Sequence, residues 1–165
     1  MLNFQKISEE HSKSFGAVYQ HQEMMKKSFI KGKNNLERVL EKYLGYNSHS
    51  PIRVTLDNYK IILKLYNHRL EFIFTKMNTG EEYLPQISFA VVNGRNNEIS
   101  REGELGIYDP VNGEWGVLCD NDTYQSWHTN IESVLSPIID DFVDIASSDE
   151  IKGYIPRLTE LPSER

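Results

Sequence analysis

The chain has 165 residues, of which 39% are hydrophobic and 25% charged, and its formal net charge is -6. These proportions are those of an ordinary globular protein, so we expect a single domain over residues 1–165. Cys119 is the sole cysteine, which excludes an internal disulfide framework and any zinc site that needs several cysteines. The first ten residues lack the pattern of a secretion signal, and no membrane-spanning apolar run occurs. We therefore expect a cytoplasmic protein that does not interact with membranes.

Two helices are expected in the first 45 residues. The first begins near Ser8, a good N-cap, and its apolar residues recur at helical spacing. Gly32 is expected to end it, because glycine commonly follows the last residue of a helix. Asn34 or Asn35 can cap a second helix. Its apolar positions are Leu36, Val39, Leu40, Tyr43 and Leu44.

From residue 52 onward the apolar residues alternate, which predicts β-strands. The connections between the strands are too short for a parallel crossover, so neighbouring strands are expected to be antiparallel. The sequence therefore predicts an antiparallel sheet of five or six strands. The expected strand segments are 52–57, 59–66, 69–76, 86–92, 105–108 and 114–119.

The hairpin over residues 59–76 has the most specific prediction. A two-residue turn at Asn67 and His68 places hydrophobic residues opposite each other on one face and Lys64 opposite Glu71 on the other. The further pairs expected from this register are Leu65 with Leu70, Leu63 with Phe72, Ile61 with Phe74, and Ile62 with Ile73.

The last third of the chain is expected to be mainly helical. An apolar stripe at helical spacing follows Asp122 or Thr123, either of which can serve as the N-cap. Pro137 interrupts the stripe, which predicts a kink or two consecutive helices. Residues 147–165 lose the pattern and are expected to form an extended, partly packed tail.

These elements together predict an α+β fold: two N-terminal helices, an antiparallel sheet of five or six strands, and one kinked or two consecutive C-terminal helices packed on the sheet. A fold of this class is compatible with many functions.

The sequence contains no recognisable catalytic or cofactor-binding motif. Neither of the glycine-rich phosphate-binding patterns, G-x-x-x-x-G-K-[ST] and G-x-G-x-x-G, occurs. A nucleophile or general base needs an orienting partner, and no such pair or triad is legible. We therefore expect no catalytic residue, no cofactor and no metal. An enzyme with a pocket between sheet and helices near His128 or Cys119 stays open as an alternative.

The charge is distributed unevenly along the chain. Residues 1–80 contain 13 Lys or Arg and 7 Asp or Glu, a net charge of +6, while residues 81–165 contain 5 and 17, a net charge of -12. Such asymmetry points to a charged partner, unless the two halves neutralise each other in the fold. Phosphate contacts by the basic half are a further alternative, although the overall acidic charge argues against nucleic acid.

Five acidic residues, named here the acidic ridge, are expected near the end of the final helix. Carboxylates are unfavourable there by about 0.3–1 kcal/mol each, because the helix dipole is negative at its C-terminal end. No Lys or Arg lies between Arg101 and Lys152. Since residues that break a local rule often belong to a functional site, we predict that the ridge binds a basic protein surface. The alternative is a solvated surface paired with lysines of the first helix. The ridge comprises Asp140, Asp141, Asp144, Asp149 and Glu150.

The leading hypothesis is an inhibitor or immunity protein that neutralises a basic, nuclease-like toxin or effector. A secretion-type chaperone for an effector is the main alternative, and such a chaperone is expected to dimerise. Both a monomer and a homodimer are compatible with the sequence.

Overall fold

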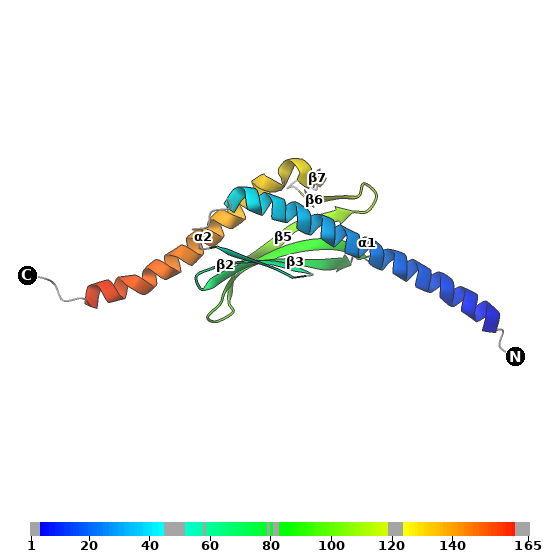
Figure 1. Ribbon diagram of the computed structural model, residues 1–165, viewed down its shortest axis with the longest axis horizontal. Helices are drawn as coiled ribbons and strands as arrows, with labels where there is room; N and C mark the ends of the chain where they lie inside the picture. Colours follow the sequence, from blue (N-terminus) through cyan, green and yellow to red (C-terminus); the bar gives the residue numbers. More distant parts are fainter. Residues whose placement is uncertain are drawn as a thin grey trace, which may run out of the picture.

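The computed structural model describes residues 4–44, 52–57, 59–78, 80, 83–118 and 124–160, in which a sheet is flanked in sequence by two long helices (Figure 1). Helix α1 covers Phe4–Leu44 and helix α2 covers Trp127–Glu160. The strands are β1 (Arg53–Leu56), β2 (Lys60–Leu65), β3 (His68–Asn78), β4 (Tyr83–Asn93), β5 (Ile99–Asp109), β6 (Glu114–Leu118) and β7 (Tyr124–Ser126).

The described strands form one antiparallel sheet in the order β1-β2-β3-β4-β5-β6-β7. This confirms the α+β class and the antiparallel pairing, but the sheet has seven strands where five or six were expected. The extra strand, β7, occupies residues that were expected to begin the last helix. Because every strand pairs with its neighbour in sequence, position along the chain equals position across the sheet. The uneven charge of the strands is therefore also uneven across the sheet.

Both helices pack on the same face of the sheet and share one buried core with it. Two tryptophans lie at the centre of this layer. The indole Nε1 of Trp115 donates to the carbonyl oxygen of Ser28 in α1 at 2.8 Å, and its ring stacks on Trp127 with centroids 5.2 Å apart. The strands contribute alternate residues to this core: Ile61, Leu63, Leu65, Leu70, Phe72, Phe74, Ile87, Phe89 and Val91.

Helix α1 is continuous, so the expected break at Gly32 is wrong. A Cβ atom at this position would lie 2.8 Å from Nε1 of Trp115 and 3.1 Å from Cε1 of Phe74. The glycine therefore permits close contact between helix and sheet instead of ending the helix. Packing outweighs the cost of about 1 kcal/mol that glycine imposes inside a helix. For the same reason Asn34 and Asn35 are internal residues and not caps.

Helix α2 runs without interruption through Pro137 to Glu160, so the expected second helix and the expected extended tail over residues 147–160 are both wrong. Residues 161–165 lie outside the described part of the chain. Buried side chains on both sides of the proline, including Leu135 and Ile138, hold this part of α2 against the sheet. Farther along, Asp149 contacts His68 of β3. These tertiary contacts hold α2 against the sheet past Pro137 and as far as Asp149.

The β2–β3 hairpin has the predicted faces but a different register. Leu65 pairs with His68, and Lys64 pairs with Arg69 instead of Glu71. The turn residues are Tyr66, which has φ 53°, and Asn67. A shift of two residues moves every cross-strand pair but leaves every side chain on its predicted face, because the side-chain period of a strand is two. The pairs observed in place of the other predicted ones are Leu63 with Leu70, Ile61 with Phe72, and Ile62 with Glu71.

Candidate binding surfaces

The acidic ridge lies within α2, not at its end. The helix continues from Glu150 to Glu160, so the expectation that the negative end of the helix dipole acts on the ridge is wrong. A different local cost applies. Asp140 and Asp144 are exposed and four residues apart, and like charges at this spacing destabilise a helix by about 0.2–0.5 kcal/mol.

The five carboxylates of the ridge do not form one uniform surface. Asp141 forms an ion pair with Arg101 of β5, and Oδ2 of Asp149 lies 3.1 Å from Nε2 of His68. These two acidic residues thus make contacts with the sheet. Asp140 and Asp144 are exposed, and Glu150 is half-buried. Asp140 and Asp144 lie one helical turn apart on α2.

His68 is the buried partner of the ridge. It is 4% exposed, and among the described residues its Nδ1 has no hydrogen-bond partner. The sequence prediction placed His68 in an exposed turn, and the two-residue change of register brings it into β3 instead. His68 also lines a pocket of about 280 Å³, to which Arg95, Asp149 and Glu150 contribute.

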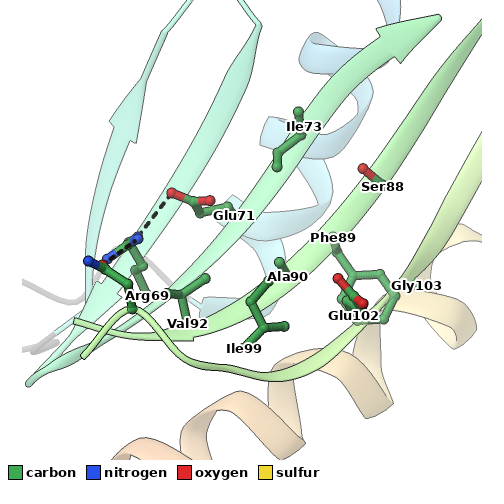
Figure 2. A pocket seen from close by; sticks show the side chains of 11 residues that line it. Arg69, Glu71, Ile73, Ser88, Phe89, Ala90, Val92, Ile99, Glu102 and Gly103 are labelled. Atoms are coloured by element: carbon green, nitrogen blue, oxygen red, sulfur yellow. Dashed lines mark hydrogen bonds and ion pairs between the residues drawn. The ribbon is translucent and has the colours of Figure 1, made fainter. Parts of the chain in front are cut away.

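A second candidate surface is the face of the sheet opposite to α1 and α2, named here the open face. It comprises Lys60, Ile62, Lys64, Arg69, Glu71, Ile73, Ser88, Ala90, Val92, Glu102 and Glu104. A groove of about 530 Å³ lies on this face, and Figure 2 shows Ile73, Ala90 and Val92 among the side chains that line it. Nε of Arg69 donates to Oε1 of Glu71 at 3.0 Å at one end of the groove. Glu102 lies at the other side.

Strand β4, in the middle of the open face, is unusually apolar. An antiparallel sheet with one face in water normally alternates between buried and exposed residues. In β4, however, residues 89–92 are all buried, and Ala90 and Val92 of this run point to the open face at 8% and 4% exposure. A continuous apolar run is typical of a strand that is covered on both faces. The signal in the sequence was the run of four consecutive apolar residues from Phe89 to Val92. The prediction of alternating strands took account only of every second residue in this run.

The two residues considered for an enzyme site are not described at the side-chain level. Cys119 and the side chain of His128 lie outside the described part of the structure. The described interface between the helices and the sheet is filled by large buried side chains, among them Trp115, Trp127 and Phe142. Within the described residues, no three His, Cys, Asp or Glu side chains come together as metal ligands would. Neither described helix has an apolar segment long enough to span a membrane.

No protein-family model matches this chain, and neither curated proteins nor solved structures match it significantly.

Proposed function

We propose that this protein is a non-enzymatic binding protein, an inhibitor or immunity protein that neutralises a basic, nuclease-like toxin or effector. The observation that carries the proposal is the charge of α2. From Trp127 to Ile151 the helix contains six Asp or Glu and no Lys or Arg. Asp140 and Asp144 are exposed on it one helical turn apart. All the charged residues in this long stretch of α2 are therefore acidic.

A basic partner would relieve the repulsion between neighbouring carboxylates of α2. Complementary charge also accelerates encounter and disfavours wrong partners, which suits an inhibitor that must intercept a toxin quickly. The active face of a nuclease is basic because it binds phosphates. An acidic helix that covers this face would exclude the nucleic acid substrate.

Internal neutralisation accounts for part of the acidic charge of α2. Nζ of Lys42 in α1 lies 2.8 Å from Oε1 of Glu132, and Arg101 and His68 contact Asp141 and Asp149. These contacts lie at the sides of α2 that approach α1 and the sheet. The outward side, which carries Asp144, is the part that the proposal assigns to the partner.

The test is capture of a partner from the native host by the wild type and by the double variant Asp140→Asn, Asp144→Asn. We expect the wild type to capture one basic protein at a 1:1 ratio. The double variant should associate with it at least about tenfold more slowly at low salt, because steering by charge acts mainly on the association rate. Raising the salt concentration should slow the wild type toward the variant.

The double variant Glu37→Gln, Glu41→Gln on α1 is the matched control, because it removes the same charge from the other helix. It should bind like the wild type. Capture of no basic protein at a 1:1 ratio, or equal association by the ridge variant, would contradict the proposal.

A secretion-type chaperone is the second candidate, favoured by the apolar run of β4 on the open face. The state of the captured partner distinguishes the two functions. A toxin held by an inhibitor stays folded, whereas a chaperone holds an unfolded segment of its client, so hydrogen exchange of the bound partner would show protection only in the first case.

A further inference from the structure

Strand β1 forms one edge of the sheet, and in the described part of the chain only β2 pairs with it. The N–H of Asp57 donates at 2.9 Å to the carbonyl oxygen of the first residue of β2. Since the direction of the backbone groups alternates along an antiparallel strand, Arg53 and Thr55 also direct theirs toward β2. Val54 and Leu56 direct their N–H and C=O groups toward the outer edge. An edge of this kind is a template for a further strand.

The apolar side chains of β1 are not covered. Val54 lies opposite Leu63 and Leu56 lies opposite Ile61, on the side of the sheet that faces the helices. Leu63 and Ile61 are 0% exposed, whereas Val54 and Leu56 are 48% and 49% exposed. The apolar layer of the core therefore reaches the edge of the sheet and ends there in water.

The charges of β1 lie on the other side of the strand. Arg53 lies directly opposite Lys64 of β2, and like charges in this position are destabilising. Asp57 is exposed at the other end of the strand. A carboxylate beside Arg53 at the outer edge would relieve its repulsion from Lys64.

The sequence of β1 is complementary to itself in an antiparallel pairing centred on Thr55. A two-fold axis perpendicular to the sheet then places Arg53 opposite Asp57 of the second copy and Val54 opposite its Leu56. The two Thr55 side chains meet at the axis, where a Thr–Thr pair is favourable. Every other contact occurs twice, because a two-fold interface uses the same surface on both subunits.

The backbone groups fit the same register. Val54 and Leu56 both direct their backbone groups outward, so that each opposed pair exchanges two N–H···O=C hydrogen bonds. Thr55, whose groups point to β2, lies in the position between two such pairs that needs none.

The other two-fold registers of β1 lack this complementarity. A centre at Arg53 or at Asp57 places two like charges opposite each other at the axis. A centre at Val54 places Arg53 opposite Thr55, and a centre at Leu56 places Thr55 opposite Asp57. Only the centre at Thr55 pairs opposite charges with each other and apolar residues with each other.

We propose that β1 is the interface of a homodimer, in which the β1 strands of two copies pair antiparallel about Thr55 and join the two sheets into one. A contact limited to one edge buries less than the roughly 1,200 Å² of a standard interface, so we expect a dissociation constant on the order of 100 µM. Helix α2 packs on β6 and β7 at the opposite edge of the sheet. Dimerisation and binding of a toxin by α2 are therefore separate properties with separate tests.

The first experiment uses two charge-reversal variants of the full chain, Arg53→Asp and Asp57→Arg. By sedimentation equilibrium at about 1 mM, ten times the expected dissociation constant, the wild type should approach twice the 19.2 kDa mass of one chain. Each variant alone should dimerise at least about tenfold more weakly, because both of its ionic contacts oppose like charges. An equimolar mixture of the variants should dimerise like the wild type, since each contact in the mixed dimer pairs Asp with Arg.

Hydrogen exchange identifies the edge directly. The amides of Val54 and Leu56 should exchange about fourfold more slowly at about 1 mM than at about 20 µM, because the dimer takes up their outward N–H groups. The amides of Arg53 and Thr55 should change less, since they are already bonded to β2.

The control is Arg95→Asp in the exposed turn between β4 and β5, which makes the same change of charge away from β1. It should dimerise like the wild type, and circular dichroism should show every variant to be folded. A wild type that stays monomeric at about 1 mM, ten times the dissociation constant expected of so small a contact, would overturn the proposal. So would variants that dimerise like the wild type, a mixture no tighter than either variant alone, or exchange at Val54 and Leu56 that is independent of concentration.

Discussion

The glycine at position 32 shows how a single residue type can serve two opposite purposes. Glycine is the commonest residue just after a helix, and it is also the residue that allows the closest approach between a helix and its neighbour. Here the indole of Trp115 occupies the space of the missing side chain. The helix continues because the buried contact contributes more than the weak local preference to stop.

Gly32→Ala is expected to destabilise the protein, although alanine is the better helix former. The added Cβ would lie 2.8 Å from Nε1 and 2.9 Å from Cε2 of the rigid, buried Trp115 ring. Overpacking of this kind costs about 1–3 kcal/mol, more than the gain in helix propensity of about 1 kcal/mol. Urea denaturation should therefore show a lower free energy of unfolding.

Gly16→Ala provides the control on the same helix. A Cβ at Gly16 meets no atom within 4 Å, so only the propensity gain applies and the variant should be more stable by up to about 1 kcal/mol. If both variants shifted the free energy of unfolding in the same direction, the packing role of Gly32 would be disproved.

At the scale of elements, α1 has two parts with different roles. Its C-terminal half packs on the sheet through Met25, Phe29, Leu36, Val39 and Leu40, which are all buried. Its N-terminal half extends past the strands, as does the C-terminal half of α2 in the opposite direction (Figure 1). On the projecting half, Val18 and Tyr19 are 53% and 63% exposed although they continue the apolar stripe. Periodicity alone therefore does not tell which turns of a helix are covered.

A pair of truncations measures this difference within α1. Leu36→Ala removes a side chain with 0% exposure and should lower the free energy of unfolding by about 2–5 kcal/mol. Val18→Ala should change it by less than about 0.5 kcal/mol, as is usual for surface substitutions. Both values come from urea denaturation. A loss at Val18 comparable to that at Leu36 would mean that the projecting half of α1 is covered in solution.

At the scale of the whole molecule, the sequential order of the strands converts the charge asymmetry of the chain into a gradient across the sheet. The ion pair of Lys42 in α1 with Glu132 in α2 joins the two halves. The side chains of Lys42 and Glu132 are 74% and 59% exposed, and ion pairs of this kind contribute about 0–1 kcal/mol. Neutralisation between the halves is thus a weak source of stability.

A double-mutant cycle on Lys42→Met and Glu132→Gln tests this conclusion. The coupling free energy is expected to be at most about 0.5 kcal/mol and to vanish at 1 M salt, because solvent and ions screen both groups. A coupling above about 2 kcal/mol that resists salt would show instead that the charged halves hold the fold together.

The candidate surfaces were only partly predictable. The acidic residues of the ridge were evident from the sequence, but which of them contact Arg101 or His68 depends on which side of α2 faces the sheet. The open face was not predicted at all. Its charges come from strands β2, β3 and β5, which become one surface only when the sheet forms.

The sequence by itself determined which strand residues face the core, because alternation is a local property that survives a register shift of two, as the β2–β3 hairpin shows. It also determined the antiparallel order, because the connections are short. Only the tertiary structure decided that α1 and α2 continue through Gly32 and Pro137 and where the hairpin turns. Those choices depend on local preferences of about 1 kcal/mol, and the packing around Gly32, the buried residues beside Pro137 and the contact of Asp149 with His68 outweigh them.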